Sequence, residues 1–314
     1  MRTNIKEADE ILDMYFPVLD NGYISLKDYM GGDESIEQAA RVSYGKGTRS
    51  TSDTRSLIRY LQRHSHSTPK EMTELTFHIS MPIFVARQFL RHRTFNVNEY
   101  SGRYSEMPDV FYTPSSERIT KQSKDNKQGS SDETIYNDEE YKVWLNERLV
   151  EENFLVYNKR LKEGWSKELA RIDLPLSTYT YFYAKCDLHN LLHFLKLRLD
   201  EHAQFEVREY AKLMAGMVKR VCPIAFEAFI DYSYASKSFS RLDLEFLRWC
   251  QNNLSQTDID YWAVDYMAIC GTGIEKPHEK IGMGKRELNE FFEKIKGPQI
   301  PNFDLDISKA VEKK

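Results

Sequence analysis

The chain has 314 residues, of which 41% are hydrophobic and 29% are charged. This length fits one large domain or two smaller ones. No apolar run approaches the roughly 20 residues that cross a bilayer, so the sequence excludes a protein with membrane-spanning helices. Lys and Arg number 44 against 48 Asp and Glu, and this balance argues against a protein that coats nucleic acid with a basic surface.

The beginning of the chain, MRTNIKEADE, lacks the apolar segment of a secretory signal. The four cysteines, Cys186, Cys222, Cys250 and Cys270, form no CxxC pair, so neither a disulfide framework nor a cysteine zinc site is indicated. We therefore expect a cytoplasmic protein without a membrane or nucleic-acid partner. Aromatic residues make up 13% of the chain, which suits either a packed core or a flat heterocyclic ligand.

The first third of the chain predicts alternating strands and helices, because its apolar residues recur first at strand spacing and then at helix spacing. In chain order these are a strand at 22–29, a helix beginning at Ser35, a helix at 52–63, a strand at 75–79 and a helix at 83–93. Thr68, followed by Pro69 and by Glu71, predicts a further helix start. Its free N–H groups would favour an anion.

Residues 121–140 are polar and almost free of aliphatic side chains, so they have too little apolar surface to order themselves. We interpret residues 119–140 as a mobile insert in a domain of residues 1–236, and residues 237–314 as a helical C-terminal extension. The other expected elements are helices at 144–161 and 165–172, a strand at 176–183, one long or two abutting helices over 188–219, helical segments at 242–249 and 286–295, and a loose end at 297–314.

The densest group of polar residues in an apolar neighbourhood lies around the helix expected at 83–93. Arg87 and Arg91 stand four residues apart on it and repel each other unless an anion lies between them. Arginine suits a planar contact with phosphate or with the carbonyl edge of a heterocycle. We favour a ligand site over a solvated helix end with salt bridges to Glu99 or Glu106. The group comprises Arg87, Gln88, Arg91, His92, Arg93, Asn98, Glu99, Ser101 and Arg103.

A second polar cluster lies on a leucine-rich helix. Leu191, Leu195, Arg198 and His202 form one stripe of this helix, so Arg198 falls among leucines. A buried charge costs several kcal/mol unless it is paired and hydrogen-bonded. Arg198 therefore needs a partner, which is either a carboxylate such as Asp200 or a bound anion.

His189 and His193 share a neighbouring stripe at a spacing that can bind zinc. The pair lacks the internal Glu of a metalloprotease motif, so we expect no metal. A metal-dependent hydrolase using His189, His193 and His202 is one alternative function. Another is a non-catalytic nucleotide- or RNA-binding protein, because arginines are interleaved with Tyr and Phe. The chain has no GxSxG, P-loop or GxGxxG motif, so a bound flavin or nucleotide would be held without a Rossmann fold.

The segment RQFLRHRTFNVNEYSGRYS contains Arg91, His92 and Arg93, followed by seven residues and Ser101. This spacing resembles the RHR-x7-S signature of flavin-dependent thymidylate synthases. The resemblance covers about residues 22–234. Further segments stand in the order that the family shows, namely AARVSYG around Ser43, HSHSTPKE around Thr68, FHISMPIFVARQ before the signature, LARIDLPL around Arg171 and NLLHFLKLRLDEHAQFEVR around Arg198.

The resemblance implies an α+β fold with a central, mostly antiparallel sheet flanked by helices. It also implies conversion of dUMP to dTMP, with 5,10-methylenetetrahydrofolate as the carbon donor and NADPH as the source of reducing equivalents through bound FAD. The family is a homotetramer whose active sites are shared between subunits, which would bring Arg198 and the signature loop together from different chains. No cysteine serves as the nucleophile in the family.

The resemblance also implies roles for individual residues. Arg198 is the catalytic candidate, which would polarise or ionise the uracil ring at N3. Asp187 and His193 stand where part of the family has asparagine, and His189 stands where it has arginine. The implied FAD contacts are Thr68, Arg91, His92, Arg93, Glu99, Asp187, Leu188, His189 and His193. The implied dUMP contacts are Gln88, Phe89, Leu90, Arg91, Glu99, Tyr100, Ser101, Gly102, Arg103, Arg171 and Arg198.

Overall fold

The computed structural model describes residues 4–42, 53–124, 129–253, 285–296 and 300–311. The chain divides into two compact units, the first made of Met1–Phe229 with Phe303–Lys314 and the second of Ile230–Asn302. The boundary expected at residue 236 therefore falls inside the second unit, and the last residues belong to the first. Among the described residues, no helix is both long enough and apolar enough to cross a membrane.

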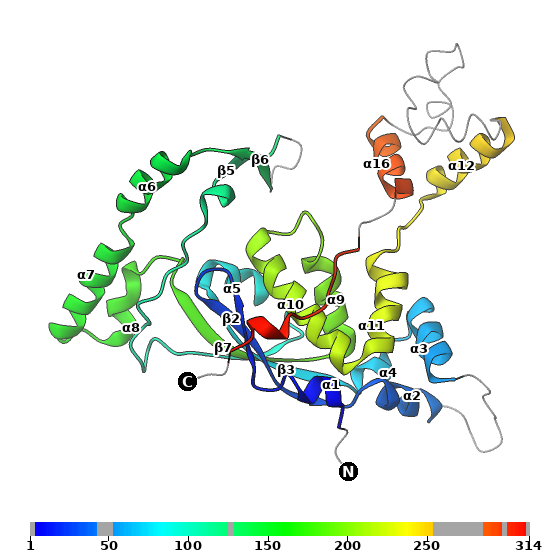
Figure 1. The fold of residues 1–314 in the computed structure, drawn as a ribbon, viewed down its shortest axis with the longest axis horizontal. Helices are drawn as coiled ribbons and strands as arrows, with labels where there is room; N and C mark the ends of the chain where they lie inside the picture. The colour runs from blue at the N-terminus through cyan, green and yellow to red at the C-terminus, as the bar shows by residue number, and fades with distance from the viewer. Residues whose placement is uncertain (1–3, 43–52, 125–128, 254–284, 297–299, 312–314) are drawn as a thin grey trace. The chain divides into compact units, whose positions relative to one another are not determined.

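The first unit is built on a five-stranded sheet in which every neighbouring pair is antiparallel (Figure 1). The sheet brings together strands from distant parts of the sequence, and with its flanking helices it confirms the expected α+β fold class. In spatial order its strands are β1 (Tyr15–Val18), β2 (Gly22–Met30), β3 (Glu74–Pro82), β7 (Tyr179–Asp187) and β4 (Asn96–Glu99).

One face of the sheet is apolar and forms the core of the first unit. Side chains alternate between the two faces of a strand, so every second residue of β3 points into this core. Leu75, Phe77 and Ile79 are fully buried there. They lie opposite Cys186, Ala184 and Phe182 of β7. The strand that strict alternation predicted at residues 75–79 is therefore confirmed.

The other face of the sheet carries tyrosines and a histidine. His78 stacks on Tyr183 with ring centroids 4.7 Å apart, and Tyr23 stacks on Tyr181 at 6.2 Å. Tyr15 meets Tyr23 edge to face at 4.9 Å. Tyr183 is 44% exposed, so part of this aromatic face is accessible in the single chain.

Helices α5 (Ile83–Phe89), α9 (Leu188–Arg198) and α10 (Phe205–Val221) pack against strands of the sheet (Figure 1). Phe89 of α5 lies 5.3 Å from Phe182 of β7 and 5.1 Å from Phe194 of α9, which places all three on the apolar face. The other α-helices that the structure describes in the first unit are α1 (Lys6–Asp9), α2 (Asp33–Arg41), α3 (Thr54–Arg63), α4 (Thr68–Glu71), α6 (Asp138–Asn146), α7 (Val150–Lys162), α8 (Lys167–Ala170) and α11 (Pro223–Phe229).

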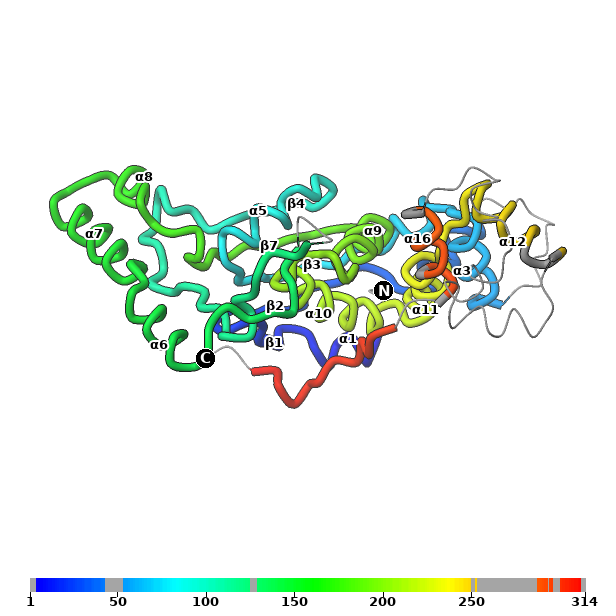
Figure 2. The backbone as a smooth tube through the Cα atoms, turned by 90° about the horizontal axis from the view of Figure 1, so that it is seen from above, coloured from blue at the N-terminus to red at the C-terminus, as the bar shows by residue number. Residues whose placement is uncertain are grey.

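Several expected elements differ from those observed. The helix expected at 83–93 ends at Phe89, and the one expected at 144–161 is split between α6 and α7. The region 188–219 forms two helices, as one of its two interpretations predicted. The helix expected at 165–172 is the short α8 followed by a 3-10 turn, Arg171–Asp173, which contacts α7 and α8. Figure 2 shows α7 and α8 side by side.

The polar insert forms more structure than its composition predicts. It contains the paired strands β5 (Thr120–Gln122) and β6 (Ser130–Thr134) and the beginning of α6. Backbone hydrogen bonds need no apolar side chain, so a polar hairpin can form where a hydrophobic pattern is lacking. The mobility of this insert stays a prediction.

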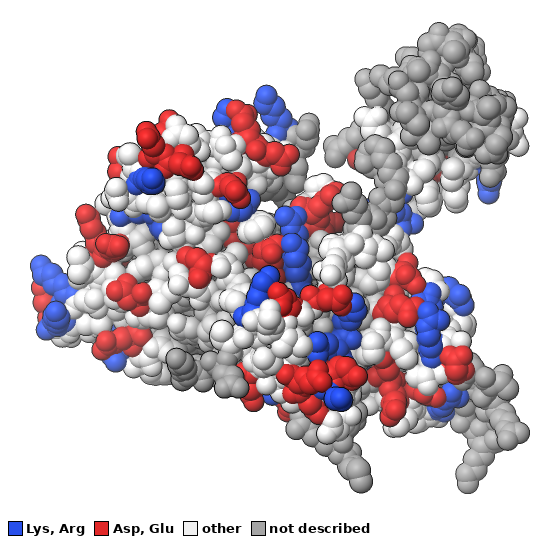
Figure 3. Space-filling model, in the orientation of Figure 1, with Lys and Arg blue, Asp and Glu red and all other residues white. Residues whose placement is uncertain are grey.

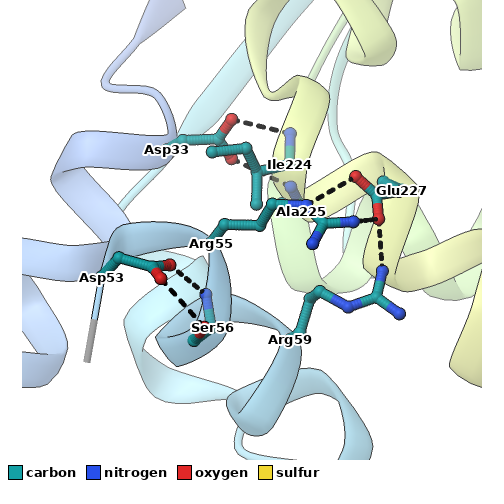
Figure 4. A network of polar contacts seen from close by, with 8 residues as sticks. All are labelled: Asp33, Asp53, Arg55, Ser56, Arg59, Ile224, Ala225 and Glu227. Atoms are coloured by element: carbon teal, nitrogen blue, oxygen red, sulfur yellow. Dashed lines mark hydrogen bonds and ion pairs between the residues drawn. The ribbon is translucent and has the colours of Figure 1, made fainter.

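Two acidic residues attach α2 and α3 to α11 (Figure 4). The Asp33 carboxylate, at the start of α2, accepts hydrogen bonds from the backbone N–H groups of Ile224 and Ala225 at 2.8 and 3.0 Å. It thus satisfies free donors at the beginning of α11. Burial raises the pKa of Asp33, while the two backbone hydrogen bonds act in the opposite direction. Further along α11, Glu227 pairs with Arg55 and Arg59 of α3.

The second unit contains α12 (Arg241–Asn253) and α16 (Lys285–Lys296), which confirms the two helical segments expected there. Phe246, Leu288 and Phe291 form its buried cluster. Lys294 pairs with the buried Asp243 at 2.7 Å. The described residues of this unit therefore form an apolar core of their own.

The end of the chain is not loose where it is described, which corrects the expectation for residues 297–314. Phe303 is buried and meets Phe226 edge to face at 5.5 Å. Val311 and Tyr15 exchange two backbone hydrogen bonds of 2.9 Å. These contacts attach the end of the chain to β1 and α11 of the first unit.

We expect Asp33→Ala to lower the free energy of unfolding of the first unit by about 1–2 kcal/mol, because two N–H groups of α11 lose a buried acceptor. Asp33→Asn, which keeps one acceptor oxygen, should lose less. Asp53→Ala removes a solvent-exposed cap of α3 and serves as the matched control with a smaller loss. Urea denaturation followed by circular dichroism measures all three, and equal midpoints for Asp33→Ala and wild type would contradict this account.

Candidate active site

The arginines of the RHR segment lie after α5 and not on it. Phe89 packs into an aromatic cluster, and the chain then turns, with hydrogen bonds from Arg91 N to Gln88 O at 3.3 Å and from His92 N to Phe89 O at 3.0 Å. Arg87, Arg91 and Arg93 are exposed. Within the described part of the chain, their side chains have no hydrogen-bond or ion-pair partner. The end of α5 thus presents three uncompensated positive charges.

The salt bridges considered as an alternative for this cluster are not formed. Glu99, at the end of β4, accepts a hydrogen bond from the Thr180 hydroxyl at 2.7 Å. Glu106 lies 3.9 Å from Lys167. The two carboxylates that could have neutralised the cluster therefore have other partners.

The half-buried Arg198 at the end of α9 donates from Nε to Nε2 of His92 at 2.9 Å. This is its only side-chain hydrogen bond among the described residues, and it has no carboxylate partner there. Asp200, which sequence suggested as its partner, instead lies 2.9 Å from His202 Nδ1. Arg198 and His92 come from the same chain, so this contact does not need a second subunit.

Burial, the charge of Arg198 and the proximity of His193 together lower the pKa of His92 to about 4. His92 is therefore neutral near pH 7, and its Nε2 lone pair can accept the hydrogen bond from Arg198. Burial also lowers the pKa of Arg198. The ring of Phe194 meets His92 edge to face at 4.8 Å and holds the imidazole in place.

Asp187, His189 and His193, which stand where part of the family has other residues, lie at or near the beginning of α9. The Asp187 carboxylate caps the helix by accepting from Asn190 N at 3.0 Å and from Asn190 Nδ2 at 2.7 Å. Leu188 is fully buried. His189 is half-buried and His193 is exposed. Asp187 thus has a structural role as a cap, and the buried side chain of Leu188 faces the core.

The signature loop brings Arg171 close to Gly102. A Cβ atom on Gly102 would lie 3.0 Å from Arg171 Cδ and 2.6 Å from Met107 Sδ. Arg103 pairs with Glu168 at 3.1 Å, and the Ser101 hydroxyl accepts from Arg103 N at 3.3 Å. The backbone N of Tyr100 donates to Tyr181 O at 2.7 Å, which anchors the loop to β7.

Of the other expected dUMP residues, Gln88 donates a hydrogen bond to Gln204. Phe89 is fully buried in the aromatic cluster, whereas Leu90 is 38% exposed. The helix start predicted at Thr68 is confirmed, because α4 begins at this residue. The helix α4 has four residues, its N-cap is Ser67, and no side chain caps it.

No group of three or more His, Cys, Asp or Glu side chains that could hold a metal ion occurs in the described part of the chain. His202 pairs with Asp200, and no contact joins it to His189 or His193 among those residues. The geometry therefore gives no support to the metal-dependent hydrolase.

Two residues were not recognised from sequence, Gln204 and the buried Glu206, which lie just before and within α10. Glu206 has apolar neighbours in sequence, Phe205 and Val207. A single carboxylate next to buried apolar positions of a helix is costly unless it is paired. That pattern is the signal that would have indicated Glu206.

Comparison with known proteins agrees with the signature. Residues 25–224 match the family model described as thymidylate synthase complementing protein. The flavin-dependent thymidylate synthase of Wolbachia pipientis wMel is 51% identical over 250 residues, which cover 79% of this chain and 87% of that protein. The chain belongs to the flavin-dependent thymidylate synthase family. Membership makes it a methyltransferase enzyme, and it confirms the resemblance seen in the sequence.

Other members of the flavin-dependent thymidylate synthase family are similar over most of their length. The enzyme of Ehrlichia ruminantium (strain Gardel) is 45% identical over 292 residues, which cover 93% of this chain and 92% of that protein. Among solved structures, the UMP/dUMP methylase PolB from Streptomyces cacaoi bound with 5-Br dUMP has a TM-score of 0.62 and 32% identity. The match covers 70% of this chain and 99% of PolB.

We expect the imidazole of His92 to titrate near pH 4 in the folded protein, against about 6.5 in the unfolded chain. Because the unfolded state binds more protons between these values, this contribution to stability is complete above pH 6.5 and is lost as the pH falls towards 4. In Arg198→Leu the pKa of His92 should rise, since a neighbouring positive charge is removed.

NMR titration of the histidine side chains measures this pKa, with His92→Asn used to assign the signal. Lys196→Leu removes a positive charge from an exposed position of the same helix and should leave the His92 titration in place. A His92 signal that moves equally in Lys196→Leu and Arg198→Leu would contradict a specific effect of Arg198.

Proposed function

We propose that this enzyme converts dUMP to dTMP, taking the carbon unit from 5,10-methylenetetrahydrofolate and reducing equivalents from NADPH through bound FAD. The observation that carries the proposal is Arg198, a half-buried arginine whose only described partner is the neutral His92. A charge in this setting is stabilised when an anionic ligand approaches. The name of the relatives and the dUMP analogue bound to PolB support a uracil nucleotide as that ligand.

Arg198 is proposed as the catalytic residue. His92 occupies Nε, and within the described residues the two terminal nitrogens of the guanidinium have no partner. These nitrogens form a planar fork suited to two adjacent acceptors such as those of a uracil ring that gains negative charge at N3. Donors already in place where charge develops contribute strongly to catalysis in a site shielded from water. His92 would hold the guanidinium plane in position.

The exposed arginines around α5 fit the phosphate groups of FAD. Arg91 and Arg93 have no partner among the described residues, so they can pair with a pyrophosphate without breaking an existing salt bridge. We propose FAD contacts for them together with His92, Thr68, Glu99, His189 and His193, and for Asp187 and Leu188 through the start of α9. Bound FAD would supply the hydride chemistry, and the chain would supply position and charge.

For dUMP we propose a site around the signature loop. Arg171 packs on Gly102 beside Arg103, and both guanidiniums are suited to the phosphate of a nucleotide. Gln88, at the end of α5, and Arg198 would complete the site. The other proposed contacts are Phe89, Leu90, Arg91, Glu99, Tyr100 and Ser101. Where the side chain is buried, as in Phe89, the contact would be made by the backbone.

No cysteine is needed in this mechanism. Burial raises the pKa of Cys186 to about 12, so its thiol is protonated and a poor nucleophile near pH 7. Cys222 is fully buried as well. Both are free thiols, which suits a reducing compartment such as the cytoplasm.

We propose a homotetramer with active sites between subunits. The tyrosine-rich face of the sheet is partly exposed in the single chain, and tyrosines are enriched at protein interfaces because they combine a large apolar ring with a polar tip. Among the described residues, no direct contact joins the Arg198–His92 pair to the Arg103–Arg171 group. This separation is consistent with an active site that combines the Arg198–His92 pair of one subunit with the Arg103–Arg171 group of another.

A function in RNA binding without catalysis has less support. On the face drawn in Figure 3, Lys and Arg side chains are interspersed with Asp and Glu and form no continuous basic band. A surface that binds nucleic acid through its phosphates would concentrate basic side chains.

The test of the proposed function is the visible spectrum of the purified protein, recorded before and after NADPH and dUMP are added, together with dTMP formation from dUMP and the folate donor. We expect a flavin spectrum that bleaches with NADPH, and dTMP as the product. A colourless protein that gains no flavin spectrum with added FAD and makes no dTMP would overturn the proposal.

We expect Arg198→Ala to retain FAD and to lose most turnover, because it removes a donor to the reacting ring; one such donor is worth about a hundredfold or more in kcat. Flavin absorbance measures retention, and dTMP formation measures turnover. Lys196→Ala, at an exposed position of the same helix, is the control with unchanged turnover. Turnover of Arg198→Ala equal to that of wild type would remove Arg198 from catalysis.

We expect Gly102→Ala to weaken dUMP binding, because its Cβ would displace Arg171 and Met107. The loss should be about tenfold or more, as expected when a charged hydrogen bond is lost. Gly164→Ala is the spatial control, since nothing lies within 4 Å of a Cβ there, although its positive φ adds local strain. Isothermal titration with dUMP measures both variants, and an unchanged Kd in Gly102→Ala would contradict a dUMP site at this loop.

A further inference from the structure

A chain of hydrogen bonds leads from the buried carboxylate of Glu206 to the side chain of Gln88. The Glu206 side chain is 5% exposed and lies 3.2 Å from Arg118 Nη2. Its Oε1 also accepts a hydrogen bond from the Tyr112 hydroxyl at 3.1 Å. With a guanidinium and a hydroxyl donating to it, the carboxylate acts as a hydrogen-bond acceptor.

This acceptor determines which way the neighbouring amide points. Glu206 Oε2 accepts from Gln204 Nε2 at 2.7 Å, because only the NH2 end of the Gln204 amide can donate to a carboxylate. The oxygen of Gln204 is thereby directed away from Glu206, and it accepts a hydrogen bond from Gln88 Nε2. The NH2 end of Gln88 is thus engaged. Its oxygen has no partner among the described residues.

We propose that Glu206, acting through Gln204, is a positioning residue that orients the Gln88 amide so that its oxygen accepts a hydrogen bond from the nucleotide. The inference rests on the proposed function, in which Gln88 contacts dUMP. The opposite orientation of Gln88 would set its oxygen against the oxygen of Gln204, and the unpaired acceptors would cost about as much as a lost hydrogen bond.

The chemistry selected at this point is a hydrogen-bond donor. In dUMP the 3′-hydroxyl of the sugar is a donor, and so is the uracil N3–H of the bound substrate before negative charge develops at N3, whereas cytosine has an acceptor at N3. Glu206 therefore influences which nucleotide binds without touching it. The packing of Glu206 in α10 also contributes to the structure of the protein. The experiment has to distinguish this structural contribution from the effect of Glu206 on nucleotide binding.

Three variants of the FAD-loaded enzyme test the direction of the hydrogen bonds. Glu206→Gln leaves the side-chain size unchanged but permits the wrong amide orientation, so Kd and KM for dUMP should rise roughly three- to tenfold. Its kcat at saturating dUMP should stay within about twofold of wild type, as for a loss of uniform binding. Gln204→Glu places two carboxylates together and should weaken dUMP binding further.

The double variant Gln204→Glu/Glu206→Gln exchanges the two side chains and restores the direction of the hydrogen bonds. The new amide at 206 donates to the new carboxylate at 204, and this carboxylate accepts from Gln88. We expect its Kd for dUMP to return to within about twofold of wild type, a recovery that general destabilisation would not produce. Glu209→Gln is the matched control, since Glu209 lies on the same helix and pairs with Lys212 at 2.6 Å; it should bind dUMP as wild type does.

The outcomes separate this inference from the proposed function. A wild-type enzyme that neither binds dUMP nor makes dTMP overturns the proposed function and with it the inference. If wild type is active, an unchanged Kd in Glu206→Gln, or an exchanged variant no better than Gln204→Glu, overturns the inference alone. Repeating the titrations with 2′,3′-dideoxyuridine monophosphate identifies the donor: the effect of Glu206→Gln disappears if the donor is the 3′-hydroxyl and persists if it is the uracil N3–H.

Discussion

The antiparallel pairing of β3 with β7 is the interaction on which the rest of the first unit depends. It extends over the whole of both strands, from Glu74 opposite Asp187 to Pro82 opposite Tyr179. Because the strands are antiparallel, α5 and α9 leave this pair from opposite ends and run back along its apolar face. Their ends therefore meet, and His92 and Arg198 come into contact although they are 106 residues apart in sequence.

The site that results combines a surplus of positive charge with little internal neutralisation. Arg198 has a neutral partner, and the exposed arginines after α5 have none among the described residues. Proteins rarely retain unpaired charge beside apolar surface without a ligand that compensates it. The net charge of -4 for the whole chain conceals this local excess, because acidic residues elsewhere outnumber the basic ones.

Local patterns predicted much of the fold. The alternation in β3, the apolar stripe of α9 and the helices α12 and α16 all follow from residue spacing. The patterns failed where an element depends on distant partners. The four residues of β4 are exposed and all but Val97 are polar, and they form a strand because the edge of β7 offers backbone hydrogen bonds. The helix α5 ends at Phe89, whose ring is held in the aromatic cluster. The helical residue pattern continues past Phe89, so the sequence could not indicate this end.

The sequence by itself determined the family, through the RHR signature and its ordered companion segments, and it determined which residues carry unusual charge. Only the tertiary structure decided how those charges are partnered. Spacing along the chain left Asp200 as a plausible partner of Arg198, but the fold pairs Asp200 with His202 and brings His92 to the arginine. It likewise connected Gln88 to Glu206, because hydrogen bonds between side chains depend on distances in space that residue types and local periodicity do not contain.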